Sequence, residues 1–446
     1  MPHIAIVNNL LTGRLYASFE LASRLQLEGH TITYLCQPRI QQKIEENGFT
    51  CFPVSEITFT YQDPRRLSMQ SGWFKKLLFH FKNWNNHYSE GKKILKIEEH
   101  KEVLRKVNPD LILIDYEMHD FIFTAFELKI PTKLTTDWFS DKISVNSPSV
   151  RTSVIPGEGL SGTKMGIVFS WFVMRTKIYG RVLIDRITFE NYRRSILKKY
   201  AQEIGFDTSG LLVNTLPPPY SFKKLPIMAM SMSELEFPHK LAKNFTYIGP
   251  MVYENRLFGK EFLMKCQQLE DIYRIKSESN KKLIYCSVGS LVKGYLPFLK
   301  KVIDAVANVD HLLLIMSIGP KMNLESFEYI PNNAYLYNWV PQLDVLKNSD
   351  CYITHCGIGS IHECIHLKVP MLLYSSKYVD QNGCAARMSY HGLGIRGDIA
   401  QDSSTRIKSN IETVLTDEMF KVNMNRYHRI YLDYKARPLT PLLFDF

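Results

Sequence analysis

The fold of this chain is decided by the stretch Cys351-Tyr352-Ile353-Thr354-His355-Cys356-Gly357-Ile358-Gly359-Ser360. Its apolar first part predicts a buried strand, His355-Cys356-Gly357 a turn, and the residues from Ser360 to Glu363 the start of a helix. A helix start presents unpaired N–H groups and a positive dipole end, which suit a phosphate. We expect His355, Gly357 and Ser360 to face that anion and Glu363 to reach a sugar hydroxyl beside it. A nucleotide diphosphate fits this arrangement, although an ordinary strand–turn–helix whose glycines only relieve steric strain is an alternative.

Apolar runs separated by helical patterns recur along the whole chain. Runs that are apolar on both faces are typical of parallel strands covered by helices on each side. The sequence therefore predicts an α/β fold with two facing Rossmann-like domains and an active site in the cleft between them. The expected strands are 4–7, 31–35, 49–53, 111–115, 133–136 and 211–215 in the first half, and 283–287, 312–317, 335–337, 351–354 and 371–374 in the second.

The domain boundaries follow from the same pattern. Tyr247-Ile248-Gly249-Pro250 ends the first alternating set, which contains a helix over 17–27 capped by Gly29, a long loop over 139–165 and helices from 166 to 203. We predict an N-terminal domain over 1–250 and a C-terminal domain over 251–425. Residues 426–446 are expected to pack back on the N-terminal domain.

Bulk composition narrows the class of protein. With 446 residues, 45% hydrophobic and 22% charged, the chain is typical of a globular protein of two or three domains. It opens directly with the strand 4–7 and has no apolar stretch of about 18 residues, so we expect a cytoplasmic protein, with membrane contact only at the periphery. The eight cysteines are irregularly spaced. This predicts buried free thiols, for example at Cys286, Cys351 and Cys364, and argues against disulfides or a structural zinc.

The positive charge is concentrated in one region. The formal charge is +11, and residues 151–200 carry ten lysines and arginines against three acids, with Phe169, Trp171, Phe172 and Tyr179 between them. This pattern fits a solvated helix face, an anionic membrane surface or an anionic substrate. Nucleic acid is the least favoured partner, because no helix-turn-helix, zinc finger or RNA-binding signature accompanies the charge.

Five short motifs in the second half carry a family resemblance. In order they are Trp339-Val340-Pro341-Gln342, His355-Cys356-Gly357-Ile358-Gly359-Ser360, Glu363, Val369-Pro370 and Asp380-Gln381. Together they resemble the donor signature of inverting nucleotide-sugar-dependent glycosyltransferases with two Rossmann-like domains (the GT-B type), the UDP-glycosyltransferase family of natural-product glucosyltransferases. The resemblance covers residues 283–390 well and the first 35 residues loosely. It implies that the first domain binds the acceptor and the second the donor.

The resemblance also implies a role for each motif residue. Trp339 would stack on the base, the Val340 backbone would bond the base edge and Gln342 would lie near the ribose. The diphosphate would be held by His355, Gly357, Gly359, Ser360 and Ser290, the ribose hydroxyls by Glu363, and the sugar hydroxyls by Asp380 and Gln381. No metal or other cofactor is expected, because the helix N-terminus and His355 take the part of a magnesium ion. Alternatively, Trp339 is a core aromatic residue, Gln342 caps a helix and Asp380 is an N-cap.

This sequence departs from the family pattern at several positions. Lys368 replaces a glycine, Cys384 an asparagine, and Ile358 a tryptophan that is common in plant relatives. The family's catalytic histidine follows a glycine after the first strand, and here that pair aligns with Gly13-Arg14. Asp115 falls at the position that orients the histidine. Arginine stays protonated at any working pH, so Arg14 cannot be the general base.

Three hypotheses follow for the missing base. In the first, another group takes the proton, either Asp137 or His119. In the second, the acceptor arrives ionised as a carboxylate or phenolate, and Arg14, positioned by Asp115, grips it. In the third, the chain binds a nucleotide sugar without catalysis.

The predicted activity is transfer of a sugar, such as glucose, from a UDP- or TDP-sugar to a lipophilic or anionic small molecule. The transfer is expected to be inverting and metal-independent. An epimerase on the same architecture needs carboxylates around the sugar on both domains, and the sequence lacks such a set.

Overall fold

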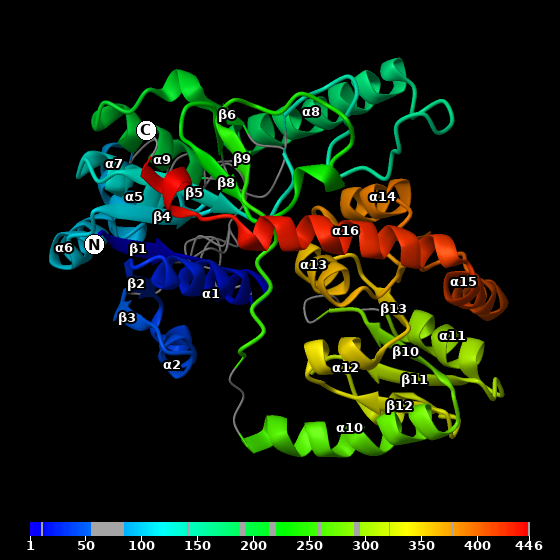
Figure 1. Ribbon diagram of the computed structural model, residues 1–446. Coiled ribbons are helices and arrows are strands. Elements are labelled where there is room, and N and C mark those ends of the chain that lie inside the picture. Colours follow the sequence, from blue (N-terminus) through cyan, green and yellow to red (C-terminus); the bar gives the residue numbers. More distant parts are fainter. Residues whose placement is uncertain are drawn as a thin grey trace.

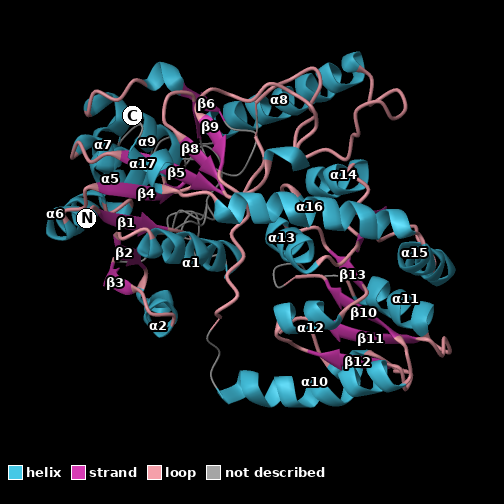
Figure 2. Cartoon of the chain, in the orientation of Figure 1, coloured by secondary structure: helices cyan, strands magenta, loops and turns pink. Residues whose placement is uncertain are grey.

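The computed structural model describes residues 1–9, 12–54, 84–140, 142–187, 192–213, 220–256, 260–289, 295–320, 322–376 and 378–444. Two parallel sheets dominate these residues, one in each half of the chain (Figure 1). Helices flank both sheets (Figure 2). The α/β class and the two Rossmann-like domains are therefore confirmed.

The N-terminal sheet has the strand order β3-β2-β1-β4-β5-β8-β9, and all its neighbours are parallel. Its central strand β4 is buried along its whole length, and β1 and β5 are buried at all but their first residue, as expected for a sheet covered on both faces. The strands are β1 (His3–Val7), β2 (Thr31–Cys36), β3 (Thr50–Pro53), β4 (Leu111–Asp115), β5 (Thr132–Thr136), β8 (Ile227–Ala229) and β9 (Phe245–Tyr247). The accompanying helices are α1 (Thr12–Leu27), α2 (Pro38–Glu46), α5 (Trp84–Ile94), α6 (Ile97–Val107), α7 (His119–Glu127), α8 (Lys164–Ile187) and α9 (Tyr192–Glu203), and β6 (Leu211–Val213) pairs with β7 (Tyr220–Phe222).

The C-terminal sheet has the order β12-β11-β10-β13-β14-β15, again fully parallel. This is the doubly wound Rossmann order, in which the chain starts in the middle and reverses direction between the first and fourth strands. Its strands are β10 (Lys282–Ser287), β11 (Leu312–Ser317), β12 (Ala334–Tyr337), β13 (Cys351–Thr354), β14 (Met371–Leu373) and β15 (Gly394–Arg396). Its helices are α10 (Lys260–Glu278), α11 (Leu296–Val306), α12 (Gln342–Asn348), α13 (Ile358–Leu367), α14 (Gln381–Tyr390) and α15 (Ser404–Thr416).

The last helices return to the first domain. Helix α16 (Glu418–Ala436) runs from the C-terminal sheet toward the N-terminal one, and α17 (Thr440–Phe444) ends beside the N-terminal sheet (Figures 1 and 2). The Glu28 carboxylate accepts from the backbone N–H of Leu439 at 2.7 Å and of Thr440 at 2.6 Å. Residues near 440 therefore contact the end of α1. The exact domain limits of 250 and 425 stay predictions.

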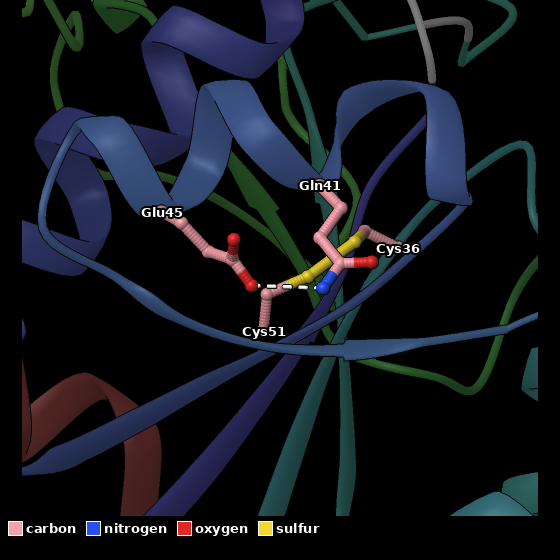
Figure 3. Close-up of a disulfide and its surroundings, with 4 residues drawn as sticks. All are labelled: Cys36, Gln41, Glu45 and Cys51. Carbon is pink, nitrogen blue, oxygen red and sulfur yellow. Dashed lines mark hydrogen bonds between the residues drawn. A yellow bond between two sulfur atoms is a disulfide. The ribbon is translucent and has the colours of Figure 1, made fainter.

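One cysteine prediction is wrong. Cys36 at the end of β2 and Cys51 in β3 form a disulfide between neighbouring strands, beneath the Gln41–Glu45 hydrogen bond of α2 (Figure 3). The two residues are 15 apart in sequence, a spacing that carries no pairing signal, and only the parallel register of β2 and β3 brings their Cα atoms to 6.7 Å. The predicted thiols Cys286, Cys351 and Cys364 are free and buried.

A buried ion pair holds the two domains together. Arg387 of α14 is fully buried, and its Nε lies 2.8 Å from Glu236 Oε2 of the first domain. Its guanidinium carbon lies 4.9 Å from the centre of the Phe139 ring and 4.7 Å from that of Phe237. In the same helix, the Gly383 N–H donates to Val150 O at 2.8 Å. The two backbones are so close that a Cβ at position 383 would collide with the Val150 backbone.

Arg387→Met should lower the free energy of unfolding by about 3–5 kcal/mol, because Glu236 keeps its buried charge without a counter-ion. Urea denaturation measures the change. The double variant Arg387→Met/Glu236→Met should recover much of the loss, and Lys421→Met, from the exposed pair with Glu418, should change stability by less than about 1 kcal/mol. Equal losses in the single and double variants would contradict the pairing.

Candidate active site

The turn between β13 and α13 lies where the C-terminal strand order reverses. Parallel strands place their carboxyl ends at one edge, and ligands of such sheets bind at this reversal. His355 follows β13, and Gly357 is the N-cap residue of α13. Gly289, which follows the neighbouring strand β10, lies against the same histidine. The predicted anion-binding turn is thus next to the loop after β10.

The His355 ring is packed between two glycines. A Cβ at Gly289 would come within 2.9 Å of His355 Nε2, and a Cβ at Gly357 within 2.7 Å. Burial lowers the pKa of His355 to about 4, although a backbone contact with Ser287 opposes the shift. The imidazole is therefore neutral at pH 7. Its buried Nδ1 has no hydrogen-bond partner within the described chain, which fits a ring that serves a ligand.

Gln342, Ser360 and Glu363 form one hydrogen-bonded group beside this turn. Gln342 Nε2 donates to Ser360 Oγ at 3.1 Å and also to Glu363 Oε2. The second Glu363 oxygen pairs with Arg256 of the segment that links the domains. Gln342 is the first residue of α12, but its side chain is turned to this group, so the predicted proximity of Gln342 and Glu363 is realised in the fold.

The remaining donor candidates surround the same edge. Trp339 follows β12 and is 40% exposed, whereas Val340 is buried, so Trp339 is no core aromatic residue. Gly359 is exposed on the first turn of α13. Asp380 is the N-cap residue of α14, but its side chain makes no capping hydrogen bond.

Gln381 and Ser290 complete the set of predicted donor residues. Gln381 is buried, and its Oε1 accepts from the backbone N–H of Ser376 at 3.1 Å, so its side chain holds a loop. Ser290 lies outside the described residues.

Opposite this edge, the N-terminal domain presents one arginine among three carboxylates. Arg14 of α1 lies 3.3 Å from Asp115 (Nη1–Oδ2), 2.6 Å from Glu117 (Nη1–Oε1) and 3.0 Å from Asp137 (Nε–Oδ1). Its guanidinium carbon is 4.5 Å from the centre of the Trp138 ring. Asp115 ends β4 and Asp137 follows β5, so parallel strands bring both acids to Arg14. Glu117 was not predicted as a site residue. It lies two residues after the end of β4, and the position of Asp115 at that strand end is what marked Asp115 as a candidate.

The charges of this cluster act on one another. Burial alone would lower the pKa of Arg14, but Asp137, Glu117 and Asp115 raise it well above its usual value. Burial raises the pKa of Asp115 to about 7 against the opposing effect of Arg14. Arg14 is thus permanently charged and fully committed to its neighbours.

Asp380 links the two halves of the site. Burial first, and then the negative charge of Asp137, raise its pKa to about 6, while Arg14 opposes the shift. The carboxylates of Asp380 and Asp137 belong to different domains, and the negative charge of Asp137 acts on Asp380.

His119 does not belong to this cluster. Its Nε2 lies 2.9 Å from Tyr220 O and its Nδ1 3.2 Å from Glu117 O, and the ring lies 5.0 Å from that of Phe222. Burial lowers the pKa of His119 to about 4. This geometry contradicts the expectation that His119 serves as a base, because both ring nitrogens face backbone carbonyls in the core. Within the described residues no group of three or more His, Cys, Asp or Glu is arranged to hold a metal ion.

Comparison with known proteins identifies the family. Residues 182–445 match the family model described as "UDP-glucoronosyl and UDP-glucosyl transferase", which is more than half of the chain. The chain belongs to the UDP-glycosyltransferase family. It is 28% identical over 212 residues to UDP-glucuronosyltransferase 2B9 of Macaca fascicularis and 22% identical over 405 residues to NDP-glycosyltransferase YjiC of Bacillus licheniformis.

Coverage differs between these relatives. The match to the glucuronosyltransferase covers 47% of this UDP-glycosyltransferase and 37% of the relative, whereas the match to YjiC covers 88% and 84%. Among solved structures, the glycosyltransferase of kitacinnamycin superposes with a TM-score of 0.68 at 19% identity and covers 99% of both chains. The calicheamicin glycosyltransferase CalG4 gives 0.64 at 17%, covering 99% of this chain and 96% of its own. These likenesses establish the GT-B fold.

Asp380→Asn should stabilise the protein at pH 8 by about 1–2 kcal/mol and have no such effect at pH 4. The folded-state pKa of Asp380 is raised to about 6, so the folded state binds this proton more tightly and loses stability as the pH rises from 4 through 6. Urea denaturation of both proteins at the two pH values measures the difference. Asp271→Asn, at a largely exposed carboxylate, is the control. A stabilisation of equal size at both pH values would contradict the assignment.

Proposed function

We propose that this UDP-glycosyltransferase moves a sugar from a UDP- or TDP-sugar to a small molecule, with inversion and without a metal ion. The proposal rests mainly on one observation. One nitrogen of His355, beside the α13 N-terminus, has no hydrogen-bond partner among the described residues, and the Arg14 acid cluster lies on the other domain. The charge of Asp137 in that cluster raises the pKa of Asp380, the residue that begins α14.

The donor would bind at the carboxyl edge of the C-terminal sheet. Trp339 offers an exposed ring for the base, and Glu363 and Gln342 offer polar atoms for the ribose. The diphosphate would lie at the α13 N-terminus, where backbone N–H groups and the neutral His355 donate hydrogen bonds. Asp380 is the candidate for a sugar hydroxyl.

Asp137 is our candidate for the general base. Arg14 cannot release its proton, and His119 lies in the core. The Asp115 side chain is 3% exposed, whereas that of Asp137 is 17% exposed, and the charge of Asp137 acts on Asp380 of the second domain. Arg14 then fixes the Asp137 carboxylate in place, and the second carboxylate, Asp115, holds Arg14.

The charge of the cluster favours a neutral acceptor. One guanidinium faces three carboxylates, so the cluster has an excess of negative charge. An acceptor that arrives as a carboxylate or phenolate would be repelled, and no charge of Arg14 is left to hold it. We therefore propose an acceptor with an un-ionised hydroxyl group.

The reaction is a single in-line displacement. The acceptor oxygen bonds to the anomeric carbon while Asp137 takes its proton, and the bond from that carbon to the diphosphate oxygen breaks. The leaving diphosphate keeps the electron pair, and the α13 N-terminus and His355 stabilise its charge. One displacement inverts the configuration.

Incubation with a set of nucleotide sugars and hydroxyl-bearing acceptors, followed by mass spectrometry, tests the proposal. Asp137→Asn should lower turnover by about 10²–10⁴-fold while leaving the affinity for UDP unchanged, because a general base contributes to chemistry and not to nucleotide binding. Glu117→Gln is the matched control at the other exposed acid of the cluster. A wild-type chain that binds UDP but never turns over would instead support a non-catalytic binding protein.

We further propose that the acceptor is lipophilic and is met at a membrane surface. Helix α8 carries an outward apolar stripe formed by Met165, Val168, Phe169, Phe172, Tyr179 and Leu183, at helical spacings of three, four and seven. Met165 is 84% exposed, Phe169 66% and Phe172 65%, whereas Ile167 and Trp171 on the other face are buried. The stripe is about 27 Å long.

Charge favours an anionic lipid surface for this stripe. From Lys164 to Ile184 the helix has four basic residues and no acidic ones. Basic flanks beside an apolar face are typical of helices that lie in the interface of an anionic bilayer. Among the described helices, none is long and apolar enough to cross a membrane, so the contact would be peripheral.

Phe169→Ser/Phe172→Ser should lower binding to phosphatidylglycerol vesicles by at least about tenfold in a co-sedimentation assay, because each ring loses its apolar burial. Added salt should weaken wild-type binding. Phe126→Ser, at a half-exposed ring of α7, should leave binding unchanged. Binding that is insensitive to the double variant would contradict the proposal.

A further inference from the structure

Arg256 lies where the segment that links the domains meets both of them. Its Nη2 pairs with Glu363 Oε1 of α13, and its Nε donates to Tyr253 O at 3.0 Å. Its guanidinium carbon lies 4.4 Å from the centre of the Tyr16 ring in α1. One side chain thus contacts the first domain, the linking segment and the second domain.

The ion pair is largely shielded from water. The side chain of Arg256 is 11% exposed and that of Glu363 is 8% exposed. A carboxylate in such surroundings is strongly oriented by its partners, because few waters compete for its oxygens. Glu363 has two such partners, Arg256 on Oε1 and Gln342 on Oε2.

These two partners leave a defined acceptor capacity. An ionised carboxylate has about four acceptor positions, two on each oxygen. With one position on each oxygen taken, one remains on each oxygen. Two adjacent acceptor positions match the two hydroxyl donors of a ribose 2′,3′-diol, whereas a 2′-deoxyribose would leave one of them without a donor.

We propose that Arg256 is a positioning residue that orients Glu363 for a ribose diol, so that the site selects a ribonucleoside diphosphate over a 2′-deoxyribonucleoside diphosphate. This inference rests on the proposed donor site. It narrows the donor from the UDP or TDP class to UDP. It also makes nucleotide affinity depend on the linking segment, since Tyr253 and Tyr16 hold the guanidinium.

A competing role for the same contact is obstruction. If Arg256 occupied the place of the ribose, nucleotide binding would have to break the ion pair. Removal of the arginine would then strengthen binding. The three contacts of Arg256 argue against a group that must move aside, because its guanidinium is held by the Glu363 carboxylate, the Tyr253 carbonyl and the Tyr16 ring together.

Titration calorimetry with UDP and 2′-deoxy-UDP tests the inference. Wild-type protein should bind UDP at least about tenfold more tightly than 2′-deoxy-UDP. Arg256→Gln should lose about tenfold in UDP affinity and much less for the deoxynucleotide, so that the preference shrinks. Arg256→Lys should restore part of the preference, because it keeps the charge. Arg274→Gln, at an exposed arginine of α10, is the matched control.

Each outcome decides the question. An unchanged preference in Arg256→Gln, or tighter UDP binding, would overturn the positioning role while leaving the proposed transferase intact. A wild-type chain that binds neither nucleotide would overturn the donor site itself. Urea denaturation checks that the variants fold. If Arg256→Gln does not, Tyr16→Leu removes the ring beneath the guanidinium without touching the ion pair and should reduce the preference in the same direction.

Discussion

The buried pair of Arg387 and Glu236 is the interaction on which the arrangement of the site depends. Arg387 lies on α14, and Asp380 is the residue that begins this helix. The ion pair and the close packing of Gly383 on Val150 fix α14 against the first domain. The position of Asp380 relative to Asp137 is therefore set by contacts that Gly383 and Arg387 of the same helix make with the first domain. A fully buried charge pair is costly to separate, so this geometry is expected to be well defined.

The acid cluster around Arg14 is the basis of our proposal that an acid, and not the residue on α1, is the general base. A histidine in this place would be a base oriented by one aspartate, whereas an arginine can only orient others. Three carboxylates gather around it, and Asp137, which is more exposed than Asp115, follows the strand next to that of Asp115. In the proposed mechanism the arginine on α1 therefore positions other groups, and the acid from the sheet edge is the candidate base.

Much of the fold could be predicted because parallel interior strands are continuous apolar runs. Strands β1, β4 and β13 appear within one residue of the predicted positions, whereas the three-residue strands β8 and β15 were not predicted. In the proposed site, residues that are close in sequence, such as His355 and Glu363, could be predicted together. Three features could not be predicted: the contact of Arg256 with Glu363, the pairing of Cys36 with Cys51, and the core position of His119. Each depends on contacts between segments that are distant in sequence.

Helix α13 carries both the proposed donor site and part of the domain interface. Its N-terminus faces the predicted diphosphate, and Glu363 faces the predicted ribose. His362, next to Glu363, lies 3.0 Å (Nε2) from Ser231 Oγ of the first domain, and His366, one turn on, lies 3.3 Å (Nε2) from Glu254 Oε2. A rigid helix cannot move its ligand-binding turn without moving these contacts. Any change in the relative position of the domains must therefore alter the nucleotide site, and a bound nucleotide must in turn favour one arrangement of the domains.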